Sequence, residues 1–285
     1  MGNTTFPKVL LLGNGINRAF GMESWENLLS SMSQGNLLSL DNVPYPLRAV
    51  ILTNDNVGNN MKEIAPMLTE MRASTEEEQL LRNIVQPFDV VLTSNYTYEL
   101  EKALCPEFKI CISSPCKFRR FARIDTTTFA RNALHTYFEF SNMNKSIWHI
   151  HGEAAKPDTM VLGHYYYGKL LAEMQKYISV LIKRYKTCKT LGNAFEYRSW
   201  IDYFLIGDVT IVGFGLDLSE IDLWWLINAK KRHFPETHIT FYKPDIKEAE
   251  KLLAEAYGIT VVCHELEDSF ADYYYKLANE LLSTQ

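Results

Sequence analysis

The chain has 285 residues, of which 47% are hydrophobic and 22% are charged, and it carries a formal net charge of -5. This share of apolar residues can fill a substantial core, which excludes a disordered chain. The acidic balance excludes a protein that binds nucleic acid through its overall charge, and we expect no direct nucleic-acid binding. A short basic run at residues 117–120 is expected to be a solvated face.

The sequence shows neither the pattern of a signal peptide nor a membrane-spanning stretch of about 18 uncharged apolar residues. We therefore expect a cytoplasmic protein without a membrane partner. The five cysteines include no Cys-x-x-Cys pair, so neither a disulfide framework nor a four-thiolate zinc site is predicted. We expect no bound metal.

Short β-branched runs alternate with longer helix-like stretches along the chain, which is typical of a parallel sheet with crossover helices. The strand candidates are residues 9–12, 88–93, 146–150, 208–212, 238–242 and 259–263, with a further short apolar run at 159–162. The helix candidates are residues 24–32, 59–86, 98–104, 165–205, 219–231, 245–256 and the segment that begins at about residue 269.

Two details of this pattern set expected helix ends. Thr75 and Glu78 are spaced as a capping box, and Gly192 with Asn193 is an expected break in the long helical segment. The stretch from about residue 105 to 144 is expected to be irregular and polar. The sequence thus predicts one α/β domain over residues 1–285. Its fold is a Rossmann-like, mostly parallel sheet with helices on both faces and helical insertions at about residues 35–86 and 165–205, the second an inserted helical module.

Three polar or glycine-bearing turns directly follow predicted strands, at residues 13–21, 93–97 and 213–217. In an open α/β sheet such turns meet at the carboxyl ends of the strands, where ligands bind and helix N-termini offer backbone N–H groups to phosphates. The pattern therefore predicts a nucleotide site. Its expected contacts are Gly13, Asn14, Gly15, Asn17, Arg18, Thr93, Ser94, Thr97, Gly213, Phe214, Gly215 and Asp217.

Two of these turns also have simpler interpretations. The first departs from the dinucleotide fingerprint G-x-G-x-x-G, because Arg18 stands where the third glycine is expected, and it can be a packing turn without a ligand. In the second turn, Ser94 or Asn95 can simply cap the helix that follows. Both alternatives remain open on the sequence alone.

Another strand end carries the imidazoles of His149 and His151. Residues two apart share a strand face, so the two histidines could begin a metal site, and His151 could equally be a structural histidine. No carboxylate or histidine partner stands out at ligand spacing, which argues against a metal.

Asn95 and His151 follow two strands of one predicted sheet, and without paired carboxylates they fit cleavage of the nicotinamide–ribose bond of NAD. Ordinary glycosidases need one carboxylic acid to protonate the leaving oxygen and a second carboxylate as base or nucleophile. The nicotinamide of NAD is already cationic and leaves as a neutral molecule, so it needs no general acid. An asparagine amide can orient a water or a hydroxyl, and a histidine can accept a proton at neutral pH.

The order of these motifs resembles that of the sirtuin-like NAD hydrolases of bacterial antiphage defence, over about residues 9–230. The resemblance rests on a first glycine turn followed by Ser24 and Trp25, a Thr-x-Asn-Tyr strand end at 93–96, a His-Gly pair at 151–152, and a Gly-aromatic-x-Leu turn before an acidic helix at 213–222. Residues 95–97 and 149–152 are also similar to AbiH-type abortive-infection proteins. The resemblance implies a sirtuin-like Rossmann domain with NAD as substrate, Asn95 and His151 as catalytic residues and Trp25 in the cofactor site.

Three departures from deacylating sirtuins bear on the activity. Thr97 stands where they have an aspartate, Ser24-Trp25-Glu26 replaces their Asp-Phe-Arg, and their four-cysteine zinc ribbon is absent from the sequence. The resemblance therefore implies an NAD glycohydrolase that depletes NAD in abortive infection, rather than a deacylase.

Two other interpretations stay open on the sequence. One is a non-catalytic module that binds NAD or ADP-ribose and controls a partner protein, and the other is an ADP-ribosyl transferase. A toxic NADase must be restrained in resting cells, so we expect a sensor or activator protein, or self-assembly, as a partner.

Overall fold

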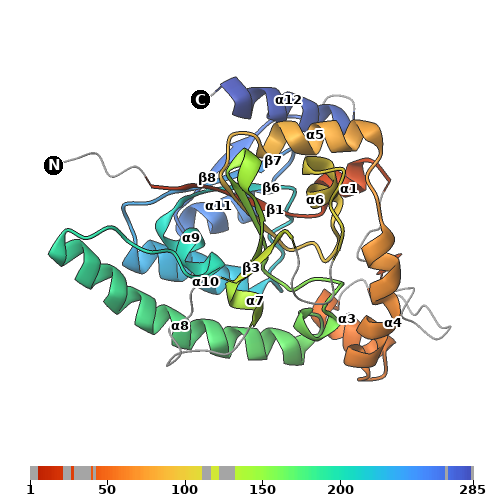
Figure 1. Ribbon diagram of the computed structural model, residues 1–285, viewed down its shortest axis with the longest axis horizontal. Coiled ribbons are helices and arrows are strands. Elements are labelled where there is room, and N and C mark those ends of the chain that lie inside the picture. Colours follow the sequence, from red (N-terminus) through yellow and green to blue (C-terminus); the bar gives the residue numbers. More distant parts are fainter. Residues whose placement is uncertain are drawn as a thin grey trace.

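The structure, a computed structural model, describes residues 6–21, 27–28, 40, 43–110, 117–121, 132–266 and 269–283. Trp25 and most of the predicted helix at 24–32 lie outside these residues, as do Cys111 and Cys116. Within the described part, eight strands form one sheet with helices packed on both of its faces (Figure 1). The predicted α/β fold with a mostly parallel sheet is confirmed.

The strands of the sheet are, in chain order, β1 (Lys8–Leu12), β2 (Val90–Thr93), β3 (Arg119–Phe121), β4 (Thr136–Phe140), β5 (Lys145–His149), β6 (Asp208–Val212), β7 (Ile239–Lys243) and β8 (Ile259–Cys263). Their order across the sheet is β3-β4-β5-β2-β1-β6-β7-β8. The strands from β5 to β8 in this order run parallel, whereas β3 and β4 add an antiparallel edge.

The central strand β1 is buried on both faces, which explains its uninterrupted apolar sequence. Successive side chains of a strand point to opposite faces. Accordingly, Leu10 and Leu12 pack into the core cluster on one face of the sheet, and Val9 and Leu11 pack into the cluster on the other. The site described below lies where this strand ends.

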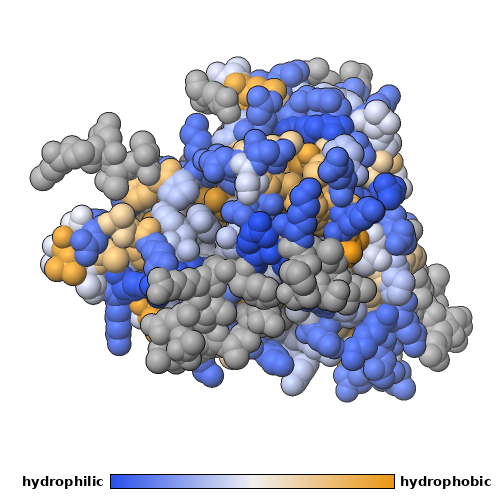
Figure 2. Space-filling model, viewed as in Figure 1, coloured by the Kyte–Doolittle hydropathy of each residue, from blue (hydrophilic) through white to orange (hydrophobic). Residues whose placement is uncertain are grey.

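The described helices are α1 (Gly15–Ala19), α3 (Tyr45–Leu52), α4 (Val57–Glu70), α5 (Thr75–Val85), α6 (Glu99–Leu104), α7 (Asn132–His135), α8 (His164–Leu191), α9 (Trp200–Ile206), α10 (Ile221–His233), α11 (Glu248–Ala256) and α12 (Phe270–Ser283). Helices α5, α6 and α12 cover one face of the sheet, and α8, α9 and α10 cover the other (Figure 1). None of the described helices is long and apolar enough to cross a membrane. On the face shown in Figure 2, hydrophilic side chains predominate, and apolar ones form small groups among them.

The sequence predicts one continuous helix over residues 59–86, and this is wrong, because two separate helices, α4 and α5, occupy the segment. Ser74, rather than Thr75, caps α5, and its hydroxyl accepts a hydrogen bond from the backbone N–H of Glu77 at 3.2 Å. A serine in extended backbone reaches the N–H three residues later in this way. The expected capping box at Thr75 and Glu78 is therefore wrong: the cap lies one residue earlier, and the carboxylate of Glu77 has no hydrogen-bond partner among the described residues that would complete a box.

Other differences lie between the predicted elements. The apolar run at 159–162 is not a strand, since Pro157–Thr159 forms a single 3-10 turn and an extended loop follows it. The stretch expected to be irregular contains β3, α7 and β4. Helix α3 lies within the helical insertion predicted at about residues 35–86 but is not among the individual helices predicted there. The expected break at Gly192 is confirmed, because α8 ends there in a left-handed residue.

The turns after β1 and β6 are joined by backbone hydrogen bonds. The N–H of Gly13 donates to the carbonyl of Val212 at 2.9 Å, and the N–H of Gly15 donates to the carbonyl of Gly213 at 2.8 Å. The chain crosses from β1 to β2 on one side of β1, whereas β6 pairs with β1 on its other side. This is a switch point of an open α/β sheet, at which ligands typically bind beyond the carboxyl ends of the strands.

A buried lysine, Lys230 of α10, connects the end of α9 to the segment before β7. Its side chain is only 2% exposed, and its three N–H groups are shared among four acceptors, the carbonyls of Phe204, Leu205 and Gly207 and the hydroxyl of Thr237. Lys230→Met removes the donor of these buried hydrogen bonds, and we expect it to lower the free energy of unfolding by about 2–4 kcal/mol, measured by urea denaturation.

The matched control for this variant is Lys231→Met. Lys231 is exposed, and among the described residues its ammonium bonds one carbonyl, that of Ala256. We expect it to change the free energy of unfolding by less than about 0.5 kcal/mol. Equal losses in the two variants would show that the buried hydrogen bonds of Lys230 contribute little.

Candidate functional site

A cavity of about 820 Å³ lies at the carboxyl ends of β1, β2, β6 and β7. Its walls come from the turns that follow β1, β2 and β6, from the end of β7, and from helices α11 and α12. The volume falls in the range of about 300–1,000 Å³ that is usual for ligand sites. The cavity is therefore the candidate site for the predicted ligand.

Most of the residues predicted from the sequence line this cavity. His151 and Thr93 are not part of its wall, and Trp25 lies outside the described residues. The predicted residues in the wall are Gly13, Asn14, Gly15, Asn17, Arg18, Ser94, Asn95, Thr97, Gly213, Phe214, Gly215 and Asp217.

The wall also contains polar residues that the sequence pattern does not single out. Examples are Glu99, Glu220, Lys243 and Tyr274. Glu220 stands directly before α10, and acidic residues are common at helix N-termini, so the sequence offers no separate signal for it. Tyr274 reaches the cavity from the last helix, about 260 residues from the first turn.

The glycines of the first turn are explained by its contact with the third. A methyl group on Gly15 would lie 2.8 Å from both the Cα and the carbonyl oxygen of Gly213, and it would also collide with the hydroxyl of Tyr274. Gly213 itself has a φ of 72°, which glycine adopts without strain. Packing between the two turns thus requires glycine at these positions, whatever ligand the cavity holds.

The third turn is held in its unusual conformation by local hydrogen bonds. Leu216 has a φ of 49°, a left-handed conformation that is costly for a leucine. The carboxylate of Asp217 accepts hydrogen bonds from the N–H and hydroxyl of Ser219, and the indole of Trp224 donates to the carbonyl of Asp217. The carboxylate of Asp217 therefore organises the cavity wall.

Asn95 is held at the cavity by its backbone. Its N–H donates to the hydroxyl of Thr93 at 3.1 Å, and its carbonyl accepts a hydrogen bond from Nδ1 of His149 at 2.7 Å. In the described part of the chain its hydrogen bonds involve the backbone alone, which leaves the amide to the cavity. The simpler interpretation as a helix cap is wrong, because Tyr98 occupies the N-cap position of α6 and no side chain caps it.

His149 is a structural partner of Asn95. Its Nε2 lies 2.8 Å from a carboxylate oxygen of Glu101 in α6. Burial by itself lowers the pKa of His149, but the charge and hydrogen bond of Glu101 outweigh this effect and raise it. The protonated ring then donates from both nitrogens, to Glu101 and to the carbonyl of Asn95.

The two histidines do not share a face, contrary to the expectation from their spacing. His149 packs against Tyr98 and Phe138 in the core on one side of the sheet, whereas His151 packs against Tyr167 in the core on the other. The reason is that β5 ends at His149 and the chain turns there, so strand alternation does not extend to His151.

The basic run at 117–120 is also not a purely solvated face. Arg119 is 8% exposed and forms a bidentate ion pair with Glu153, to which Tyr98 also donates a hydrogen bond at 2.8 Å. Burial raises the pKa of Glu153, but Arg119 outweighs it and holds this pKa below its usual value. The pair anchors the loop after β5 next to the ring of His149.

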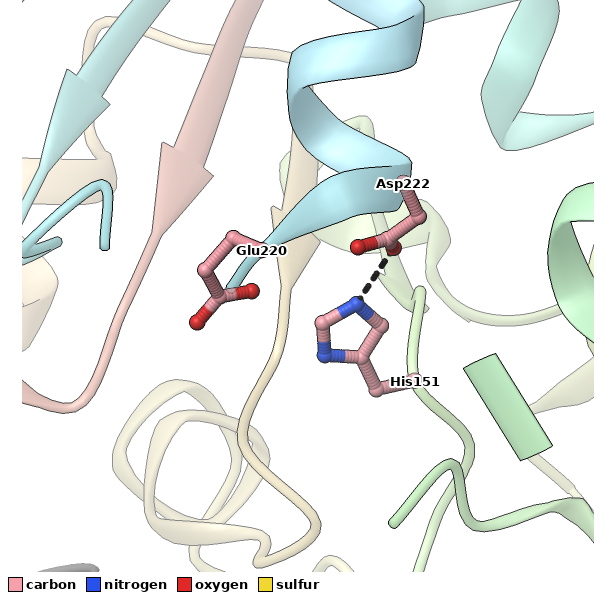
Figure 3. Close-up of side chains that lie close together, drawn as sticks. All are labelled: His151, Glu220 and Asp222. Carbon is pink, nitrogen blue, oxygen red and sulfur yellow. Dashed lines mark hydrogen bonds and ion pairs between the residues drawn. The ribbon is translucent and has the colours of Figure 1, made fainter. Parts of the chain in front are cut away.

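His151 lies beside two carboxylates at the start of α10 (Figure 3). Its Nε2 donates to a carboxylate oxygen of Asp222 at 2.7 Å, and both side chains are buried, with exposed fractions of 1% and 0%. A carboxylate oxygen of Glu220 lies within 4.8 Å of ligand atoms of both residues. The sequence shows no carboxylate partner for His151, but the fold supplies two, so that expectation is wrong. The histidine and the two carboxylates form one compact cluster, of which only Glu220 lines the cavity.

The contact between His151 and Asp222 in this cluster is a hydrogen bond. Zinc bonds to nitrogen and oxygen are about 2.0–2.1 Å long, so two ligand atoms on a tetrahedral zinc lie roughly 3.3 Å apart. The 2.7 Å between His151 and Asp222 is a hydrogen-bond distance. The contact is better described as a histidine–aspartate dyad than as two ligands of one ion.

Glu220 is the member of the cluster with the clearest electrostatic perturbation. Burial raises its pKa to about 7, the charge of His151 opposes the rise, and the negative charges of Asp222 and Asp217 add to it. One of its oxygens, Oε2, is buried and has no hydrogen-bond partner within the described residues. The carboxyl group can thus gain or lose a proton near neutral pH.

The comparison with known protein families agrees with this arrangement. The chain matches the SIR2-like domain over residues 89–262, a range that includes β2, Asn95, His151 and the turn after β6. The first strand and its glycine turn lie outside this range but join the same cavity. A search of curated proteins gives no match. SIR2-like domains use NAD as a substrate, and since the match covers more than half of the sequence, the chain belongs to the SIR2-like family.

Proposed function

We propose that the protein is an NAD glycohydrolase, which cleaves NAD to nicotinamide and ADP-ribose. One observation carries the proposal: Asn95 and Glu220 both line the same cavity. The hydrogen-bonded pair of His151 and Asp222 lies next to Glu220, outside the cavity wall. The SIR2-like match supplies NAD as the ligand. In this proposal the first turn, with Arg18, binds the pyrophosphate, and the turn after β6 lies near the adenosine.

The proposed reaction needs few groups from the protein. The bond between the ribose and the nicotinamide nitrogen breaks, its electron pair stays with the nitrogen, and nicotinamide leaves neutral. Water forms the new bond to the ribose carbon and releases one proton. Asn95 orients this water through its amide, and the cluster of His151, Asp222 and Glu220 takes the proton. On the sequence alone, His151 is the residue expected to accept the proton of the attacking water.

The experiment is incubation of the purified protein with NAD, followed by chromatographic detection of nicotinamide and ADP-ribose in equal amounts. The reaction is expected to proceed unchanged in a chelator, because the proposed steps use the side chains of Asn95 and of the cluster alone. It should be run over a range of protein concentrations, since we propose that a sensor or activator protein, or self-assembly, controls the activity of the enzyme.

A second candidate is a module that binds NAD or ADP-ribose without cleaving it. The observation that favours it is the burial of His151, which is not part of the cavity wall. Such a module binds NAD in calorimetry but releases no nicotinamide at any protein concentration. Calorimetry and nicotinamide release, measured on the same purified protein, therefore distinguish the two proposals.

We further propose a role in abortive infection, as the order of the sequence motifs implies. Induced expression in bacteria is then expected to lower cellular NAD and arrest growth, and Asn95→Ala is expected to abolish both effects. Growth arrest without a fall in NAD would contradict the proposal.

A further inference from the structure

The cavity brings a ligand to Glu220 and not to His151. Glu220 forms part of the cavity wall, whereas His151 is 1% exposed and lies outside that wall. In Figure 3 the carboxylate of Glu220 and the ring of His151 gather below the first turn of α10, where Asp222 accepts the hydrogen bond of His151. A water bound in the cavity therefore meets the carboxylate before the imidazole.

The surroundings of Glu220 suit a proton acceptor. Its Oε2 is buried and has no hydrogen-bond donor among the described residues, so nothing else there competes for that oxygen. A carboxylate oxygen that lacks donors holds a proton more readily than a solvated one. The titratable and charged groups that act on it are Tyr96, Tyr167, His151, Asp217 and Asp222.

We propose that Glu220 is the catalytic residue that accepts the proton of the attacking water, and that His151, fixed by Asp222, is a positioning residue whose charge acts on Glu220 from behind. This inference rests on the proposed NAD hydrolysis and changes the residue to which the sequence assigns the proton. Water forms a bond to the ribose carbon, its proton passes to the carboxylate of Glu220, and nicotinamide leaves with the electron pair of the broken bond.

The first test is Glu220→Gln, which keeps the shape of the side chain and removes its basicity. We expect kcat for nicotinamide release to fall by about 10²–10⁴, the usual contribution of a general base, with little change in KM or in the melting temperature. The control is Glu236→Gln, because Glu236 forms an ion pair with Lys189 away from the cavity, and this variant should keep the parental kcat.

The second test is the pH profile of kcat. A base must be deprotonated to act, so the rate of the parent enzyme should rise with pH through about 7, as Glu220 loses its proton. His151 lowers the pKa of Glu220, so His151→Gln should move the midpoint of this rise to higher pH. If Glu220 is the base, the variant regains activity at about pH 9, whereas it stays inactive at every pH if His151 is the base.

The outcomes separate this inference from the function on which it rests. A parent enzyme that releases no nicotinamide overturns the proposed hydrolysis and the inference with it. A parent enzyme that is active, with Glu220→Gln equally active and the same pH profile, overturns the inference alone. Loss of activity in Glu220→Gln, together with recovery of His151→Gln at high pH, supports both.

Discussion

Replacing Asn95 with alanine is expected to lower the rate of nicotinamide release by at least about 100-fold, with the fold and NAD binding largely intact. Loss of one group that orients or stabilises the reacting atoms typically costs about 10²–10³ in kcat. The hydrogen bonds of Asn95 to Thr93 and His149 use its backbone, so they persist in the variant. The measurement is kcat together with calorimetric titration of NAD and the melting temperature.

The control for this variant is Asn193→Ala. Asn193 lies in the exposed segment after α8, where its backbone N–H bonds the carbonyl of Cys188. Its side chain is not part of the cavity, and the variant should hydrolyse NAD like the parent. If Asn95→Ala turned over NAD at the parental rate, the proposed role of the amide would be wrong.

The fold could be predicted from the sequence because its central strands have a clear local pattern of apolar residues. Residues 9–12 are all apolar and residues 209–212 are apolar except for Thr210, and both runs are strands that end at glycine turns and lie between two helical layers. The edge strands β3 and β4 have no such signal. Arg119 lies in β3, and it is buried because Glu153, 34 residues later, forms an ion pair with it.

Only part of the site could be predicted from the sequence, because local patterns show where strands end but not which distant residues meet there. The turns that line the cavity could be predicted, since every parallel strand ends at the same edge of the sheet. The partners that give each side chain its role could not. Nε2 of His151 meets Asp222, 71 residues later, and the carbonyl of Asn95 meets His149, 54 residues later. Contacts at such separations follow from the packing of α10 and α6, which no local pattern encodes.

Gly15→Ala is expected to weaken NAD binding and to destabilise the fold at the same time. The added methyl would lie 2.8 Å from backbone atoms of Gly213, and backbone cannot yield as a flexible side chain does. The turns after β1 and β6 must then move apart and break the hydrogen bond between Gly15 and Gly213. Overpacking of this kind costs about 1–3 kcal/mol, which lowers the melting temperature by several degrees in a chain of this size.

The matched control is Gly215→Ala in the third turn. A methyl on Gly215 meets no described atom within 4 Å, so Gly215→Ala should change the free energy of unfolding of the protein by less than about 0.5 kcal/mol. If the first turn binds the pyrophosphate, Gly15→Ala weakens NAD and ADP-ribose alike by at least about 10-fold, because both carry that group. If Gly15→Ala instead lowered the melting temperature but bound both ligands with parental affinity, the turn would serve packing alone, and the pyrophosphate would have to lie elsewhere in the cavity.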